Sequence, residues 1–230
     1  MLLVVASRQD QNANELVARW APRRATLLAC EDLCHHGWQF DPGNPERGWL
    51  VAGGSVMAVS GITGVLTRRR HIFDVELTEI AIEDRPYVAA EINAFLVAWL
   101  SSLRCPVINR PSGISLCGPS LRAEQWVCLA ASVGIRVKPA RRKAYMGTIS
   151  SPALSEVQEL SEVIVVGEHW FGLVDDYLGA LAVRLARAAG AELLSITFDQ
   201  ETFAGASSLP VLNSEPVIGA VLERLEARYS

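Results

Sequence analysis

Lysine is the residue this sequence lacks most clearly. Only Lys138 and Lys143 are lysines among 21 basic residues, so arginine carries nearly all the positive charge of the 230-residue chain. The bias runs through the whole chain and is typical of a GC-rich genome. Any chemistry that needs a lysine therefore has two positions to use.

Several motifs that carry catalysis or nucleotide binding are also absent. The sequence has no G-x-x-x-x-G-K-S/T loop, no G-x-G-x-x-G after a strand and no G-x-S-x-G elbow. Its four histidines, two of them adjacent, give no Ser/His/Asp order. His71 and His169 are interpreted as ordinary loop or hairpin residues.

Long apolar runs, a secretory signal and strong charge are missing as well. No run is long enough to span a bilayer, and residues 1–5 lack a basic flank. The five cysteines are an odd number and lie in apolar segments. We expect a reduced, cytoplasmic protein without a membrane partner. The net charge of −4 gives no case for general nucleic-acid binding.

The segments that are present predict an α/β fold. Residues 2–6 and 25–29 are apolar runs typical of buried parallel strands, and a helix capped by Asn12 or Asn14 lies between them. Two β-prone runs around Gly53-Gly54 predict a hairpin. The strand 64–67, the helix 85–103 and the strand 107–109 then form a crossover unit.

The second half is predicted to mix helices with strands. The expected elements are a helix capped by Ser120 and ended by Gly134, a hairpin around residues 167–169, a helix over 175–189, a strand over 192–199, a loop over 200–208, a strand over 209–212 and a last helix over 217–229.

Arginines follow both strands of the crossover unit. Arg68, Arg69 and Arg70 end one strand, and Arg110 follows the other. Ligands of open α/β sheets bind beyond the carboxyl ends of strands, and arginine suits carboxylate or phosphate. The cluster therefore predicts a site for an anionic ligand or partner. A solvated structural cluster is the alternative.

Two other groups suggest metal sites. Asp199 and Asn213 end two predicted neighbouring strands, with Glu215 close by, and such oxygens can hold Mg²⁺. A structural turn is the alternative. Two cysteines and two histidines within residues 30–36 suggest zinc, but adjacent histidines point apart, which favours a structured loop.

The order of these motifs resembles a known family. The segment Val65–Arg70, a helix containing Glu91, the turn Asn109-Arg110-Pro111 and the run Val137-Lys138-Pro139 are similar to the ATP-grasp carboxylate–amine ligases. The branch with ribosomal-protein glutamate ligases and microviridin-type peptide ligases fits best. The resemblance implies a Rossmann-like pre-ATP-grasp domain, residues 1–115, and a reduced α+β ATP-grasp remnant, residues 116–230.

The departures from the family shape the functional expectation. The family's phosphate-binding lysine at the start of a helix corresponds to Arg122, and its metal-binding glutamate corresponds to Val211, while Asn213 is kept and Asp199 matches the other metal carboxylate. Between Tyr145 and Val163 there is too little chain for the central lid. ATP and Mg²⁺ are the cofactors that the resemblance implies, yet these losses argue against independent ligase activity.

We therefore expect a degenerate ATP-grasp protein. It would act as a recognition, scaffold or regulatory subunit with a protein or peptide partner, in peptide or amino-acid modification. An apolar surface where the lid once packed would bind a partner or a second copy. The alternatives are a minimal ATP-dependent ligase completed by a partner or by oligomerisation, and a small-anion-binding module.

Overall fold

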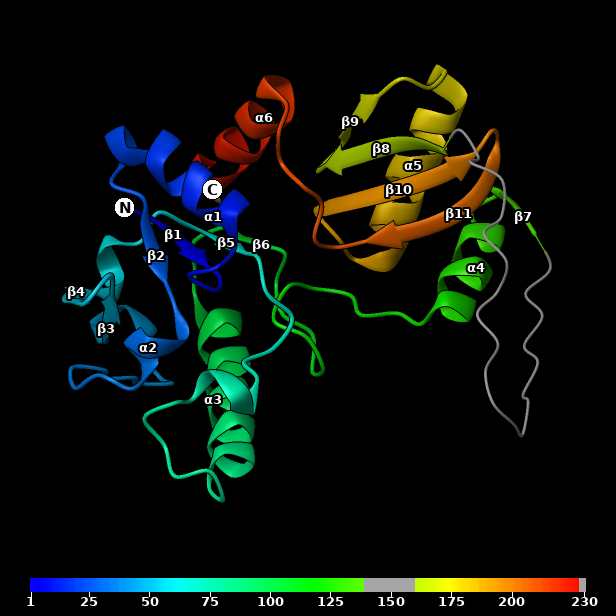
Figure 1. Cartoon of the computed structure of the whole chain (residues 1–230). Helices are drawn as coiled ribbons and strands as arrows, with labels where there is room; N and C mark the ends of the chain where they lie inside the picture. Colours follow the sequence, from blue (N-terminus) through cyan, green and yellow to red (C-terminus); the bar gives the residue numbers. More distant parts are fainter. Residues whose placement is uncertain (139–159, 228–230) are drawn as a thin grey trace.

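The first sheet consists of four parallel strands. In the computed structural model, which describes residues 1–138 and 160–227, their order is β2-β1-β5-β6 (Figure 1). Helix α3 (Arg85–Ser102) connects β5 to β6, so the predicted crossover unit is confirmed. The strands are β1 (Leu2–Val5), β2 (Thr26–Leu28), β5 (Gly64–Thr67) and β6 (Val107–Ile108).

Helices cover both faces of this sheet. Successive side chains of a strand point to opposite faces, so neighbouring residues of β1 enter different cores. Leu3 packs in the core that contains α3. Leu2 packs in the core that contains α1 (Gln11–Arg19) and α6 (Glu215–Glu226). Burial on both faces explains why these strands read as continuous apolar runs.

A hairpin and a short helix form a layer beside β2. Strands β3 (Trp49–Ala52) and β4 (Ser55–Ala58) pair antiparallel around Gly53-Gly54, as predicted. Helix α2 (Cys30–Leu33) precedes them. Trp38 packs edge-on against Phe95 and Trp99 of α3, each with ring centroids 5.4 Å apart, and so joins this layer to the main core.

The second sheet has five strands in the order β7-β11-β10-β8-β9. Helices α4 (Ala123–Ser132) and α5 (Asp176–Ala189) cover one face. Ile164 and Leu193 on the other face join the core of α6 and the first sheet. The strands are β7 (Arg136–Val137), β8 (Leu160–Val166), β9 (His169–Gly172), β10 (Leu193–Asp199) and β11 (Thr202–Ser207).

Two predictions about the end of the chain are wrong. The expected loop 200–208 contains β11, which pairs antiparallel with β10 from Asp199↔Thr202 to Ser195↔Ser207. The expected strand 209–212 is not a strand. Side chains bind its main chain instead, because Asn12 pairs with both the amide and the carbonyl of Leu212 and Arg68 donates to the carbonyl of Pro210.

Two predicted helix caps are also wrong. Asp10, and neither Asn12 nor Asn14, caps α1 by accepting a hydrogen bond of 2.9 Å from the amide of Ala13. Helix α4 starts later than Ser120 predicts. Arg122 is its N-cap residue, and the Gln125 side chain accepts from the Arg122 amide at 2.8 Å.

Asn109 joins the two sheets. Asn109 is 1% exposed, and its side chain makes four hydrogen bonds, three of them to residues 192 and 193 of the second sheet and one to Cys117. The amide nitrogen donates to the carbonyls of Leu193 (2.8 Å) and Cys117 (3.3 Å), and Oδ1 accepts from the amides of Glu192 and Leu193 (both 2.8 Å). Gly118 has φ +90°, and a Cβ there would lie 2.6 Å from the Asn109 Cβ, so the turn requires glycine.

The proposed division at residues 115 and 116 stays a prediction. Figure 1 shows α6, which follows the second sheet in sequence, beside α1 and the first sheet, and Val221 and Leu225 of α6 pack with Leu2 and Leu66. The sequence also contains a basic run at residues 141–143 and predicts a short helix near Ser155, and both lie outside the described residues. So does most of the segment on which the prediction of a missing lid rests.

Within residues 1–138 and 160–227, no helix combines the length and apolar character needed to cross a bilayer.

Replacing Asn109 tests the junction. Asn109→Ala removes the oxygen that accepts from the amides of Leu193, which is buried, and Glu192, which is half-buried, so we expect a loss of about 2–4 kcal/mol in the free energy of unfolding. Urea denaturation measures it. Asn213→Ala is the control, because Asn213 is exposed and we expect a change below about 0.5 kcal/mol. Equal effects at the two positions would contradict the role of Asn109.

Two helical glycines predict opposite effects of the same substitution. A Cβ at Gly179 of α5 would lie 2.2 Å from the Trp170 ring, whereas a Cβ at Gly219 of α6 meets nothing within 4 Å. Alanine favours helix over glycine by about 1 kcal/mol. Gly219→Ala should therefore raise the melting temperature, and Gly179→Ala should lower it despite its better propensity. A higher melting temperature for both variants would show that the Trp170 ring moves away from position 179 without a loss of stability.

Candidate functional site

Arg68 lies at the end of β5 and binds within the chain. Its side chain is 8% exposed, forms an ion pair with Asp10 (3.1 Å) and donates to the carbonyl of Pro210 (2.9 Å). It thus connects the cap of α1 to the segment that follows β11. The Arg68 guanidinium is largely buried and bonded to two acceptors, so it has a structural role and is not available to a ligand.

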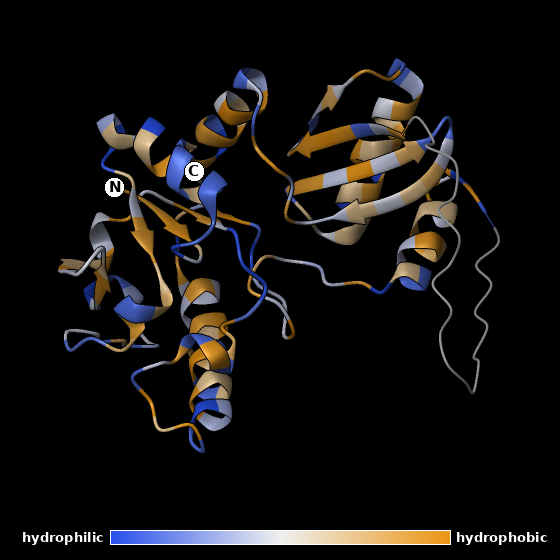
Figure 2. Cartoon of the chain, viewed as in Figure 1, coloured by the Kyte–Doolittle hydropathy of each residue, from blue (hydrophilic) through white to orange (hydrophobic). Residues whose placement is uncertain are grey.

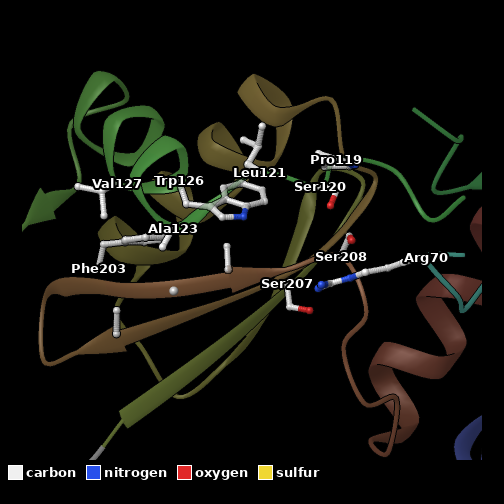
Figure 3. A pocket seen from close by; sticks show the side chains of 13 residues that line it. Arg70, Pro119, Ser120, Leu121, Ala123, Trp126, Val127, Phe203, Ser207 and Ser208 are labelled. Atoms are coloured by element: carbon white, nitrogen blue, oxygen red, sulfur yellow. The ribbon is translucent and has the colours of Figure 1, made fainter. Parts of the chain in front are cut away.

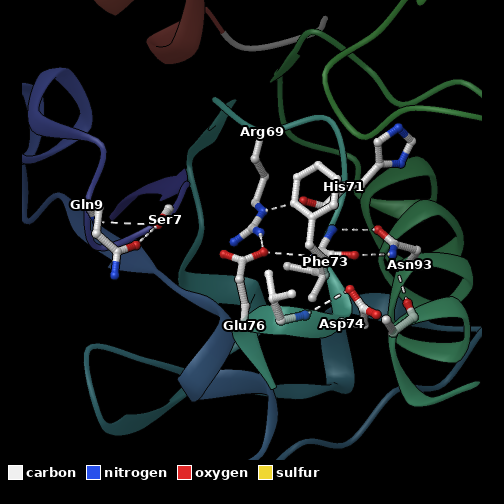
Figure 4. Close-up of polar contacts among 11 residues, drawn as sticks. Ser7, Gln9, Arg69, His71, Phe73, Asp74, Glu76 and Asn93 are labelled. Carbon is white, nitrogen blue, oxygen red and sulfur yellow. Dashed lines mark hydrogen bonds and ion pairs between the residues drawn. The ribbon is translucent and has the colours of Figure 1, made fainter. Parts of the chain in front are cut away.

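Arg69 points to the opposite side and is also held internally. It pairs with Glu76 and donates to the carbonyl of His71 at 3.0 Å (Figure 4). Asn93 of α3 brackets Ile72 in the same segment, accepting from its amide and donating to its carbonyl, both at 2.9 Å. Nη1 of Arg69 is buried without a partner in the structure. Arg69 therefore anchors the loop after β5.

Arg110 binds the end of α3. Its guanidinium donates to the carbonyls of Ser101 (3.3 Å), Leu103 (3.2 Å) and Cys105 (3.3 Å). The last carbonyls of a helix have no partner within the helix, and a cation there also matches the helix dipole. This is a C-terminal cap, so the structure does not bring Arg110 together with the arginines after β5 in one ligand site.

Arg70 is the arginine of the cluster that remains available. It is exposed, and no side-chain hydrogen bond or ion pair involves it in the described part of the chain. Its side chain extends from the first sheet toward Ser207 and Ser208 at the end of β11 (Figure 3). Arg70 thus places a cation at the junction of the two sheets, although the three neighbouring arginines do not act together.

A cavity of about 270 Å³ lies beside Arg70. One end is polar, with Arg70 and the hydroxyls of Ser120, Ser207 and Ser208. The other end is formed by Leu121 and Trp126 near the start of α4 and by Phe203 of β11. An anionic group with an adjoining apolar group matches this arrangement, because arginine and hydroxyls bind the first and the ring-lined end takes the second.

Arg122 does not line this cavity, although both of its neighbours in sequence do. It is exposed as the N-cap residue of α4, whereas its neighbours Leu121 and Ala123 line the cavity. The main chain of α4 is fixed there by Gln125.

The two predicted metal ligands lie at different ends of the β10–β11 hairpin. Asp199 is at the turn, where it forms an ion pair with Lys138 at 2.5 Å. Asn213 is exposed and follows the other end of β11. Seven residues of β10 separate those ends, roughly 20 Å at about 3.3 Å per residue. The missed strand β11 accounts for the difference, because Asp199 and Asn213 were expected at the ends of two neighbouring strands, 192–199 and 209–212.

No group of three or more histidine, cysteine, aspartate or glutamate side chains is arranged to hold a metal ion in residues 1–138 and 160–227. Near the suggested zinc site, Cys30 begins α2 and His35 Nδ1 contacts the carbonyl of Glu31 at 2.7 Å.

Burial raises the pKa of the Cys30 thiol to about 11. Burial likewise raises the pKa of Cys105 to about 11. Both thiols stay protonated at neutral pH and are poor nucleophiles.

Sequence reasoning missed most of the cavity's lining. Phe203, Ser207 and Ser208 were assigned to a loop, and Trp126 was not considered as a site residue. Thr202 and Phe203 favour a strand, but the small residues 204–207 that follow do not, so the strand pattern is weak. Lys138 was noted only as part of a motif, and its ion pair with Asp199 requires the parallel pairing of β7 with β11.

Comparisons with known proteins bear on the fold. No protein-family model and no curated protein sequence match the chain. Solved structures do match. The macrocyclase MdnC from Microcystis aeruginosa, bound with the precursor peptide MdnA, has a TM-score of 0.70 at 12% identity, covering 97% of this chain and 98% of that one.

Two further structures have bound peptide and nucleotide. A RiPP-associated ATP-grasp ligase from Chryseobacterium gregarium, in complex with ADP and a leader and core peptide, has a TM-score of 0.66 at 10% identity, covering 97% of this chain and 96% of that one. The ATP-grasp ligase PsnB, with minimal precursor, Mg and ADP, has a TM-score of 0.62 at 12% identity and 98% coverage of both chains. The chain therefore has the fold of ATP-grasp ligases, as its motifs indicated.

Proposed function

We propose that this chain is a peptide-recognition or scaffold protein with an ATP-grasp fold, which serves peptide or amino-acid modification without performing the ligation itself. One observation carries the proposal. Most of the side chains that the sequence predicts for anion and metal binding are bonded within the chain. Arg68, Arg69 and Arg110 bind carboxylates or main-chain carbonyls, and Asp199 binds Lys138.

The oxygen ligands do not fit Mg²⁺ at the expected place. Mg²⁺ needs several oxygens in near-octahedral arrangement, usually one or two carboxylates with phosphate oxygens. Asp199 already neutralises Lys138, Asn213 is at the other end of the hairpin, and position 211 is valine. Acyl-phosphate chemistry needs Mg²⁺ to neutralise developing charge, so the described side chains support recognition better than catalysis.

The cavity beside Arg70 supports recognition of a peptide carboxylate. Its volume of about 270 Å³ suits one side chain or chain end better than a whole nucleoside triphosphate. Arg70 and the three serine hydroxyls bind a carboxylate, and the end near Trp126 and Phe203 takes an apolar neighbour. Structural neighbours crystallised with precursor peptides support a peptide as the ligand class.

A ligase completed by a partner or by oligomerisation is the second candidate. The exposed, uncompensated Arg70 favours it, because an arginine at the junction of two sheets also suits a phosphoryl group. In that case ATP and Mg²⁺ would use ligands from the other subunit together with Arg70 and Arg122. Measurements on the chain alone and with its copurifying partner distinguish the two candidates.

Nucleotide binding provides the first test. Isothermal titration calorimetry of the full chain with ATP and Mg²⁺ should detect no binding tighter than about 1 mM, because residues 1–138 and 160–227 assemble no metal donor set. A dissociation constant in the micromolar range that weakens with Arg122→Ala would overturn the proposed loss of activity and favour the ligase candidate.

Peptide selection provides the second test. A displayed random peptide library is selected on the wild-type chain, with Arg70→Gln as the counter-target and Arg24→Gln, another exposed arginine, as the control variant. Enriched peptides should share a carboxylate. Arg70→Gln should weaken a synthetic representative about 10-fold or more, which is the loss of one charge-assisted contact. Enriched peptides that bind Arg70→Gln and wild type equally would contradict this site.

A further inference from the structure

Helix α3 has an outward face unlike that of an ordinary surface helix. Its inward face is buried through Ala89, Leu96, Trp99 and Leu100. The outward residues recur every three or four positions, and only one is charged. A helix on a protein surface normally presents charged and polar residues to water, so this face lacks its expected solvent side. The exposed residues from Tyr87 on are Tyr87, Ala90, Glu91, Ala94, Ala98 and Ser101.

Larger exposed apolar side chains surround the same helix. Tyr87 is 69% exposed and Ile114 is 67% exposed, and Phe73, Val75 and Ile82 in the segment before α3 are exposed as well. Between α3 and the turn that contains Ile114 lies a hollow of about 540 Å³, lined along the helix by Ala90, Ala94 and Val97. Figure 2 shows α3 as predominantly hydrophobic along most of its length. Protruding and hollow apolar regions on one face are typical of an interface.

The two ends of α3 carry opposite charge. Glu79, Glu83 and Asp84 are exposed before its first turn. At the other end Arg110 caps the helix carbonyls and is itself exposed, with no carboxylate partner in the described part of the chain. A surface of this kind is complementary to itself when the helix direction is reversed, because the acidic end then meets the basic end.

We propose that the outward face of α3 binds a second copy of this chain, with the two α3 helices antiparallel across a two-fold axis close to Ala94. Ala94 is at the middle of Arg85–Ser102, so the axis places it opposite its counterpart. Tyr87 of each copy then lies over Ala98 and Ser101 of the other. Small residues at the crossing allow the helices to approach closely, and each acidic end faces Arg110 of the other copy.

This surface meets the cavity that the proposed function uses at one residue, because Arg70 lines both that cavity and the hollow beside α3. The outward residues of α3 do not line that cavity, and its lining comes mainly from α4 and β11. A substitution at Ala94, which lines only the hollow beside α3, can therefore abolish dimerisation while the residues of the cavity stay unchanged.

Sedimentation velocity of the full chain between about 1 and 100 μM tests the proposal. Wild type should form a dimer in this range. Ala94→Arg places two like charges at the axis in an apolar contact and should raise the dimer dissociation constant about 100-fold. Ala18→Arg is the matched control, since Ala18 is an exposed alanine on helix α1. It should leave the dissociation constant unchanged, and unaltered far-UV circular dichroism shows that both variants fold.

Cross-linking locates the axis independently. In a chain carrying Cys34→Ser and Cys128→Ser, which removes the exposed thiols, Ala94→Cys should give a covalent dimer on oxidation and Ala18→Cys should not. Two results overturn the proposal. One is a wild-type chain that stays monomeric over the whole concentration range. That result would also hold if α3 bound a different protein. The other is a dimer that Ala94→Arg leaves intact.

Discussion

The hydrogen bonds of Asn109 are the interaction on which the arrangement of the two sheets depends. A primary amide offers donors and acceptors at one end of a short side chain, and here it binds Cys117 of its own connection and residues 192 and 193 at the start of β10. Because the amide is buried, a missing partner would cost the full desolvation of a polar group. The junction thereby fixes where Arg70 from one sheet meets Ser207 and Ser208 from the other.

Most of the other polar side chains near this junction strengthen the structure and are not free for a ligand. Asn12 and Arg68 hold residues 210–212 by their main chain, and Arg110 caps α3. These side chains pair with main-chain groups that have no partner within a helix or strand, either because the segment is irregular or because it is a helix end. The similarity to ligases at 10–12% identity is a similarity of fold.

The remaining candidate functional features lie at two places, the cavity beside Arg70 and the outward face of α3. The cavity beside Arg70 combines a cation with hydroxyls and aromatic rings, which is recognition chemistry for a small anionic group. The outward face of α3 is apolar and carries opposite charges at its ends, which is the chemistry of an interface. The proposed scaffold function would use both kinds of surface, the cavity for a ligand and the outward face of α3 for a second chain.

The sequence by itself determined the elements whose signals are local. Apolar runs specified the parallel strands, Gly53-Gly54 specified a hairpin, and Asp175 and Gly190 specified the ends of α5. Contacts between distant residues decided the rest. Small residues concealed β11, which forms because β10 offers it an edge, and residues 209–212 failed to form a strand because Asn12 and Arg68 satisfy their main chain. The arginines after β5 looked equivalent in sequence, yet only tertiary structure decided that two find internal partners and Arg70 does not. Local propensity acts over a few residues, whereas hydrogen-bond partners across a junction exist only after the chain has folded.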